Sequence, residues 1–393
     1  MSRVHVARRR YIALLDEEAW NEVELARDTS FLGLAGSDAV VGRLPLIRGL
    51  VVRLPPRLVD AAPTRWPTRV PTGVLALCPE RLFRPALDRV RRDVGAEEAW
   101  GLLRAASPGG DGAGAGACVA LVDSGVNPHP DLCRPSQRLL AFADLVRGRR
   151  DPYDDCGHGT HLAGVIAGGG VVDRRYRGIA PGARLVAVKA LDEYGRGRES
   201  AVIAAIEWCV RHRRAYGIDV LNLSVGAPLV GPPETDPACR AVRAAWQEGI
   251  VVVTSLTDSG PTTSPGVEPS VIAVATAGLP PRPSPRARRR PDLLAPGAGV
   301  VSLAVPQDRR DRRAAGRPPE SCRTAEAVKA PLRWYAPMSG ASVAAAVVSG
   351  VAALMVSARG ATDPERVKAD LIRTAEGGLV RADAAVRAYL DRP

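Results

Sequence analysis

The apolar positions in the C-terminal two thirds of the chain fall into short continuous runs that alternate with longer amphipathic stretches. The runs end at small or polar residues and span 117–123, 183–191, 218–226, 249–256 and 270–278. Such runs are typical of strands covered on both faces, as in parallel sheets. Helical stretches are expected at 161–168, 199–215, 239–249 and 342–358. The alternation predicts an α/β fold with a doubly wound, mainly parallel sheet, whose ligands bind at the carboxyl ends of the strands.

The first hundred residues follow a different pattern. Short strands are expected at 11–16, 46–54 and 72–80, with helical patches near 16–27, 57–66 and 80–92. This pattern predicts a small α+β domain over residues 1–106. The glycine-rich segment SPGGDGAGAGA, residues 107–117, indicates a flexible, exposed linker. Residues 118–393 then form the larger domain.

Charge and composition narrow the classes of function. The formal net charge is +12, and it comes almost entirely from arginine because the chain has only three lysines. The basic clusters RARRR (286–290) and DRRDRR (308–313) lack neighbouring aromatic residues that could stack on bases. A solvated basic surface is therefore favoured over nucleic-acid binding. No apolar run approaches the roughly 18 residues of a membrane span. We expect neither a nucleic-acid nor a membrane partner, and the pattern does not indicate the oligomeric state.

The termini and cysteines bear on the compartment. Near the N-terminus only YIALL is apolar between arginines and acids, which is too short for a signal peptide. The seven cysteines are an odd number without the paired spacing of metal sites, so free thiols are favoured. In an oxidising compartment, Cys133 and Cys156 would be the candidates to bridge. A cytoplasmic protein is expected, and a secreted one if the start of the chain is mis-assigned.

Three motifs carry the chemistry. ALVDSG ends a buried run with Asp123, CGHGTHLAG opens a helix with His158, and MSGASVAAAVVSG opens an apolar helix with Ser342. An acid that orients an imidazole, an imidazole that takes a proton and an activated hydroxyl are the parts of covalent acyl-transfer catalysis. Taken alone, DSG is usually a turn and a serine at a helix start is usually a cap. The prediction therefore depends on the three motifs together.

Over residues 117–390 the sequence resembles the subtilisin-like serine proteases. The order Asp, His, Ser is that of the family, and six further segments match: VALVDSGVNPHPDL, HGTHLAGVIAG, GIAPGARLVAVKAL, LNLSVG, EPSVIAVAT and PDLLAPGAGV. The resemblance implies a serine endopeptidase acting on a peptide or protein substrate. Asp123 would orient His158, which would act as general base and then general acid. Ser342 would attack the scissile carbonyl.

The resemblance also assigns substrate-binding residues. Ser224, Val225 and Gly226 match the family's edge strand, which pairs with an extended substrate. Leu256 and Thr257 stand where the family has small residues in one wall of the primary specificity pocket. This departure implies a narrow pocket that favours small or modest side chains.

Asp258 stands where the family has an asparagine that donates a hydrogen bond to the oxyanion of the tetrahedral intermediate. The second donor of this oxyanion hole is the backbone N–H of Ser342. An ionised carboxylate cannot donate, whereas a protonated one can. No asparagine lies near position 258 in the sequence to replace the lost one, and Ala341 replaces the family's threonine before the nucleophile. Three interpretations stay open: a buried, protonated Asp258, slow catalysis on a tightly held substrate, or a catalytically impaired pseudoprotease that binds extended peptide segments.

No cofactor or metal is expected. His158 and His161 offer only two candidate ligands. Asp131 matches an acid that many relatives use to bind calcium. The loop that would supply its partners, GGGVVDRRYRG, carries arginines and offers only Asp173 besides backbone oxygens, so calcium is not favoured.

Residues 10–85 resemble, in pattern, the small propeptide domain that assists folding and inhibits the enzyme in secreted relatives. The glycine-rich linker after residue 106 would then be the cleavage site. The alternative for this domain is a substrate-recognition module.

Overall fold

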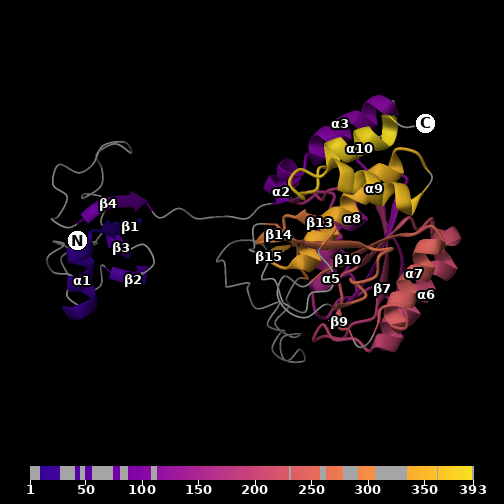
Figure 1. Ribbon diagram of the computed structural model, residues 1–393, viewed down its shortest axis with the longest axis horizontal. Helices are drawn as coiled ribbons and strands as arrows, with labels where there is room; N and C mark the ends of the chain where they lie inside the picture. The colour runs from indigo at the N-terminus through magenta and orange to yellow at the C-terminus, as the bar shows by residue number, and fades with distance from the viewer. Residues whose placement is uncertain are drawn as a thin grey trace, which may run out of the picture. The chain divides into compact units, whose positions relative to one another are not determined.

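The computed structural model describes residues 9–26, 40–44, 49–54, 74–79, 87–107, 113–229, 232–256, 263–277, 291–305, 334–360 and 362–391. Two compact units make up the chain, Met1–Arg84 and Pro85–Pro393 (Figure 1). Each unit has a hydrophobic core of its own.

The described part of the N-terminal unit is a four-stranded antiparallel sheet with a helix after its first strand. Its elements are β1 (Arg9–Leu15), α1 (Glu17–Ala26), β2 (Val40–Leu44), β3 (Gly49–Leu54) and β4 (Val74–Pro79), with strand order β2-β3-β1-β4. Trp20 and Val23 of α1 share a core with Leu15, Leu50 and Val52. The sequence pattern does not predict β2, since Gly42 and Arg43 interrupt its apolar run. The helix expected at 57–66 lies outside the described residues.

The boundary between the units differs from the expected one at residues 107–117. Helices α2 (Leu87–Asp93) and α3 (Ala96–Ala106) belong to the second unit. Helix α3 packs against α10 (Ala382–Asp391), and Trp100 donates its indole N–H to the Ile179 carbonyl at 2.9 Å. The reason is the apolar stripe of α3, which buries Ala99, Trp100 and Leu103.

The expected glycine-rich linker is part of the second unit where it is described. Ala113 and Ala117 are each 1% exposed. The Ala113 carbonyl accepts from Gly182 N at 2.7 Å and the Ala117 carbonyl from Arg184 N at 2.9 Å. Small residues here allow close packing as well as flexibility, so composition alone misassigned this stretch to an exposed connector.

The second unit is built on a seven-stranded sheet whose pairings are all parallel. In spatial order the strands are β13 (Leu293–Ala295), β12 (Ile272–Thr276), β10 (Val251–Ser255), β8 (Val220–Leu223), β5 (Cys118–Asp123), β7 (Arg184–Lys189) and β6 (Leu139–Asp144). The predicted doubly wound α/β class is confirmed. Edge strand β6 is not predicted from the pattern, because its faces are only partly buried and its apolar run is short.

Helices cover both faces of this sheet. Helices α5 (His158–Ala167) and α8 (Ala341–Ser357) pack together on one face, and α6 (Glu199–Tyr216) and α7 (Pro237–Gln247) pack together on the other (Figure 1). Helix α8 contacts β8, β10, β12 and β13 and buries nearly its whole length, which explains its apolar sequence. Helix α9 (Pro364–Thr374) packs beside α8 and α10.

Two short ribbons and two small helical turns complete the unit. They are β9 (Ala227–Pro228) with β11 (Thr263–Ser264), β14 (Val300–Leu303) with β15 (Tyr335–Met338), α4 (Pro130–Cys133) and η5 (Arg174–Tyr176). Within the described ranges, no helix combines the length and apolarity needed to cross a membrane.

Candidate active site

The three predicted catalytic side chains come from a strand end and two helix starts. Asp123 is the last residue of β5, His158 the first of α5 and Ser342 the second of α8. Gly157 and Gly340 precede these helices with φ values of 91° and 151°, which side chains rarely adopt. These glycines let the chain turn sharply into each helix, so that the two side chains emerge at the carboxyl edge of the sheet.

The structure brings the three side chains into one hydrogen-bonded row. His158 Nδ1 lies 2.7 Å from Asp123 Oδ1, and His158 Nε2 lies 3.1 Å from Ser342 Oγ. Asp123 is 1% exposed, and its Oδ1 also accepts from Ser124 N at 2.7 Å. A carboxylate at Nδ1 favours the tautomer with the proton there, which leaves Nε2 to accept from the serine hydroxyl.

The topology explains why the row forms here. Strand β5 lies between β7 and β8, where the chain changes its direction of travel along the sheet. At such a switch point the connections leave to opposite sides and open a crevice at the carboxyl ends of the strands. Asp123 ends β5, and Ser224 follows the neighbouring end of β8.

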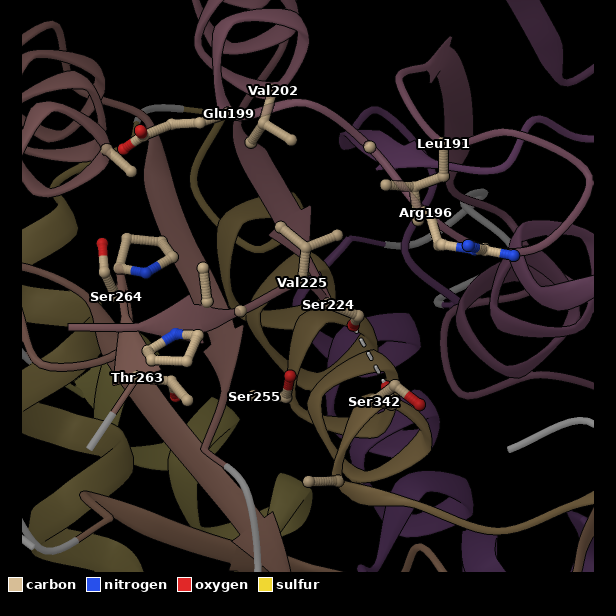
Figure 2. A pocket seen from close by; sticks show the side chains of 18 of the residues that line it. Leu191, Arg196, Glu199, Val202, Ser224, Val225, Ser255, Thr263, Ser264 and Ser342 are labelled. Atoms are coloured by element: carbon tan, nitrogen blue, oxygen red, sulfur yellow. Dashed lines mark hydrogen bonds between the residues drawn. The ribbon is translucent and has the colours of Figure 1, made fainter. Parts of the chain in front are cut away.

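A cleft of about 840 Å³ lies beside the row and is lined by His158, Ser342 and the segment Ser224–Gly226 (Figure 2). Ser224 Oγ donates to the Ser342 carbonyl at 3.3 Å. Figure 2 shows Val202 on one side of this segment, with Ser255 and Thr263 on the other. The cleft therefore places the predicted strand-pairing segment next to the predicted nucleophile.

Three further residues were predicted for the oxyanion hole and the specificity pocket. Two of them, Thr257 and Asp258, lie outside the described residues. Leu256 is 7% exposed and is not among the described residues that line the cleft. The asparagine nearest to the cleft in sequence, Asn222, uses its amide for Ser224 Oγ at 3.1 Å and accepts from the Ser349 hydroxyl at 2.9 Å. Its side-chain amide is thus engaged by Ser224 and Ser349 and does not replace the asparagine that the family has at position 258.

The sequence analysis missed Lys189, which holds the turn after Asp123. Lys189 ends β7 in register with Asp123 and is fully buried. Its Nζ donates to the Ser124 carbonyl at 2.6 Å, the Leu191 carbonyl at 2.8 Å and Asp155 Oδ1 at 2.6 Å. All three ammonium protons are used. A lysine inside the apolar run RLVAVK was the available signal, because a buried cation requires partners.

The fit of calcium at Asp131 is poor. The Asp131 carboxylate is buried and accepts from Gly170 N at 3.2 Å, Val172 N at 2.9 Å and the Tyr335 hydroxyl at 2.9 Å. These are donors, whereas a calcium ion needs oxygen ligands in their place. Asp173 is turned to Arg175, with 2.5 Å between Asp173 Oδ2 and Arg175 Nη2.

An internal cation lies beside that acid instead. The Arg138 guanidinium is buried and donates to the carbonyls of Asp131, Ala167 and Ala183. Its N–H groups satisfy the backbone oxygens that converge there. This arrangement holds together α4, α5 and the start of β7.

His161 points away from His158. It is 1% exposed, and its Nε2 lies 3.0 Å from the Val300 carbonyl of β14. Burial lowers the pKa of His161 to about 4, so the ring is neutral near pH 7. In the described part of the chain, no group of three or more His, Cys, Asp and Glu side chains is arranged to hold a metal ion.

Comparison with known proteins gives consistent matches. The sequence model of the subtilase family matches residues 114–390. "Serine protease AprX" of Bacillus subtilis (strain 168) is 35% identical over 280 residues, which cover 65% of this chain and 60% of that protein. "Subtilisin BL" of Lederbergia lenta is 31% identical over 310 residues, 73% of this chain and 98% of that protein. A solved "cold adapted subtilisin-like serine proteinase" aligns with a TM-score of 0.51 at 26% identity, over 68% of this chain and 85% of that one.

The parallel sheet, the hydrogen-bonded row and these matches agree on one class, the subtilisin-like serine-type endopeptidases. The chain belongs to the subtilase family. It spans 60% of the length of AprX and nearly all of subtilisin BL.

Proposed function

We propose that this chain hydrolyses peptide bonds through an acyl-enzyme formed on Ser342. The observation that carries the proposal is the row from Asp123 Oδ1 through His158 to Ser342 Oγ, with separations of 2.7 and 3.1 Å, at the edge of the cleft. Both distances are within the reach that proton transfer requires.

The proposed reaction has two halves. His158 Nε2 takes the proton from Ser342 Oγ as that oxygen attacks the scissile carbonyl, and a tetrahedral intermediate forms. His158 then gives the proton to the leaving amine, and the C–N bond breaks to leave an ester on Ser342. Water, activated by the same imidazole, hydrolyses the ester. Buried Asp123 holds the imidazole in place and stabilises its charged form in both halves.

The segment Ser224–Gly226 is proposed to fix the register of an extended substrate by backbone hydrogen bonds. Its position between Val202 and the pair Ser255 and Thr263 supports this role, because substrate side chains would alternate between the two sides (Figure 2).

We propose that specificity is narrow and favours small side chains on the Thr263 side. A Cβ at Gly226 would already lie 3.3 Å from Thr263 Cβ, so little width is available. The Thr263 hydroxyl is buried and has no hydrogen-bond partner among the described residues. A small polar side chain would satisfy it, since an unpaired buried hydroxyl is costly.

The oxyanion hole is proposed to use the Ser342 backbone N–H and Asp258. Asp258 donates only when protonated, and this supports an activity optimum on the acidic side. The same substitution favours the second candidate function, a pseudoprotease that holds extended segments in the cleft without cleaving them, because loss of one oxyanion donor typically costs about 10² to 10³ in turnover.

For the N-terminal unit we propose a propeptide-like role. Its four-stranded antiparallel sheet, with a helix after the first strand, supports this assignment. Since α2, α3 and residues 113–117 belong to the peptidase unit, release is proposed near Arg84 and not within 107–117. A substrate-recognition module remains the alternative role, and it would keep the chain intact.

We propose a cytoplasmic location, as the cysteine pattern favours. Cys133 and Cys156, the candidate bridging pair, are present as thiols and not as a disulfide, as are Cys118, Cys209 and Cys239. One relative is by name extracellular, the "Minor extracellular protease Vpr" of Bacillus subtilis (strain 168). Fractionation of expressing cells tests this location. Recovery of the protein only from the medium would contradict the proposal.

Peptidase function is tested by exposing a peptide library to the wild type and to Ser342→Ala at pH 5 and pH 7.5, with cleavage read by mass spectrometry. The wild type is expected to cleave at few sites, with small residues before the cut and with turnover highest where Asp258 is protonated while His158 is still neutral. Absence of wild-type cleavage at both pH values would support the pseudoprotease. Equal cleavage by both proteins would reveal a contaminant.

A further inference from the structure

Asp154 is a buried acid that the catalytic scheme above does not use. It lies between β6 and α5 and is 4% exposed. Its Oδ1 accepts from the Ser124 hydroxyl at 2.9 Å, from Cys156 N at 3.1 Å and from Gly157 N at 2.7 Å. Its Oδ2 accepts from Thr160 N at 2.8 Å and from the Thr160 hydroxyl at 2.7 Å.

These contacts reach both partners of the Asp–His pair. Ser124 directly follows Asp123, and its hydroxyl also accepts from Gly159 N at 3.0 Å. Cys156 and Gly157 directly precede His158, and Thr160 lies in the first turn of α5. One carboxylate therefore joins the end of β5 to the start of α5, the two places that carry the acid and the imidazole.

Five donors, three of them backbone N–H groups, favour the ionised form of this carboxylate. Burial raises the pKa of Asp154, and the hydrogen bonds from Thr160 and Gly157 oppose that rise. Both oxygens are fully occupied by donors, so a proton on either would displace a hydrogen bond. In its ionised form Asp154 places a second negative charge close to the catalytic pair, beside that of Asp123.

We propose that Asp154 is a positioning residue that holds Asp123 and His158 in register and whose negative charge stabilises the imidazolium of His158. The effect on rate rests on the proposed function, whereas the effect on the imidazole does not. Among the described residues, the other charged or titratable groups around the pair are Lys189 on β7, Asp155, Arg147 and Cys156 in the adjoining loops, Arg196 and Glu199 in the cleft wall and His161 on α5.

The direct test is the titration of His158 by NMR in the full chain, which has five histidines. Histidine labelled with ¹³C is observed from pH 4 to 9, and the His158 signal is assigned by its loss in His158→Gln. Removing a buried negative charge disfavours the imidazolium, so Asp154→Asn is expected to lower the His158 midpoint by about one pH unit.

Asp219→Asn is the matched control. Asp219 also accepts from a backbone N–H and a hydroxyl, those of Cys118 and Thr362. It directly precedes β8 and contacts the first residue of β5, whereas Asp123 is the last residue of β5. Strand β5 separates the two ends by roughly 16 Å at about 3.3 Å per residue. The control is expected to leave the His158 midpoint unchanged. A midpoint in Asp154→Asn equal to the wild-type value, or an equal shift in Asp219→Asn, would overturn the proposal.

Ser124→Ala separates positioning from charge and also serves if Asp154→Asn does not fold. It keeps the carboxylate and removes its link to β5. The His158 midpoint is expected to stay, while the rate constant for labelling Ser342 with a fluorophosphonate falls about tenfold. An unchanged rate constant would contradict the positioning role. A wild type that titrates normally but is never labelled would refute the proposed function and leave the NMR comparison valid.

Discussion

Oxyanion stabilisation limits how fast a serine nucleophile of this geometry can work, because the tetrahedral intermediate needs hydrogen-bond donors as well as a base. The base is provided by His158, whose Nε2 lies 3.1 Å from Ser342 Oγ. In the proposed oxyanion hole the donor side would depend on Asp258, which stands in the sequence where the family has an amide. At the residue scale, therefore, the catalytic row is complete, whereas the proposed side-chain donor requires a proton.

Asp258→Asn restores a donor that needs no proton. We expect turnover at pH 7.5 to rise about 10²-fold over the wild type, since one oxyanion donor is typically worth that much. The wild-type optimum, acidic by the same reasoning, should move toward neutral pH. Turnover on a cleaved library peptide is measured across pH 4–9, with Asp258→Ala as the control that gains no donor. A gain in Asp258→Ala equal to that in Asp258→Asn would show that charge removal alone is responsible.

The residues of the catalytic row could be predicted because each sits in a local motif, DSG, HGTH or SGAS, with a family order. Asp154 and Lys189 could not. Their roles depend on hydrogen bonds to segments 30 to 65 positions away, such as Ser124 for both. The local pattern shows only an acid before a helix and a cation inside a strand.

At the scale of elements, the loop after α5 is held by protein groups where calcium would bind. Gly170, Val172 and Tyr335 donate to Asp131, and Arg138 binds the nearby carbonyls. The Asp131 carboxylate, which a calcium ion would need as a ligand, therefore already accepts from protein donors.

Chelation should accordingly leave stability unchanged. Excess EDTA is expected to shift Tm by less than about 1 °C, because the Asp131 oxygens are held by protein donors in the place of an ion. Asp131→Asn, which disrupts the same network, should lower the free energy of unfolding by about 2 kcal/mol. Both are read by thermal and urea unfolding. A fall in Tm with EDTA that added calcium reverses would contradict this prediction.

Helix α5 makes stability depend on pH through His161. Its pKa falls from 6.5 to about 4 in the folded chain, because burial disfavours the charged ring. The unfolded chain therefore binds a proton between those values that the folded chain does not. Stability is full above pH 6.5 and is lost as pH falls toward 4, by about 1.4 kcal/mol per pH unit.

The measurement is the free energy of unfolding in urea from pH 7 to 4.5, for the wild type and His161→Gln. Other groups that titrate in this range are the same in both proteins, so the comparison isolates His161. The variant should be less stable at pH 7 and should show a shallower decline. Parallel declines in the two proteins would show that His161 does not titrate as stated.

Continuous apolar runs made the central strands predictable, since β5, β7, β8, β10 and β12 are covered on both faces. Edge strand β6 escaped because its middle residues are half exposed and lack that signature. Helix α3 was not predicted either. The domain boundary was placed after it, at residues 107–117, because a glycine-rich stretch that packs closely resembles in composition one that is exposed.

For the whole molecule, the division into Met1–Arg84 and Pro85–Pro393 has a consequence for maturation. Removal of the first unit would leave the peptidase core, including α2 and α3, intact. A propeptide in this position would be released by the enzyme it precedes.

N-terminal sequencing of purified protein is therefore expected to start near residue 85, and Ser342→Ala should keep residue 1. Asp219→Asn is the control: this residue is half-buried like Ser342, and the variant is expected to be processed as the wild type is. A start within 107–117 would restore the boundary inferred from composition. Processing that persists in Ser342→Ala would assign the cleavage to another protease.

The central claim is that Ser342 is an activated nucleophile. The most direct measurement is the intact mass and labelling rate of the protein with a fluorophosphonate, compared among wild type, His158→Gln and Ser342→Ala. The claim predicts one adduct on Ser342, formed about 10³-fold more slowly without the imidazole and absent without the hydroxyl. A wild type labelled no faster than His158→Gln would contradict it.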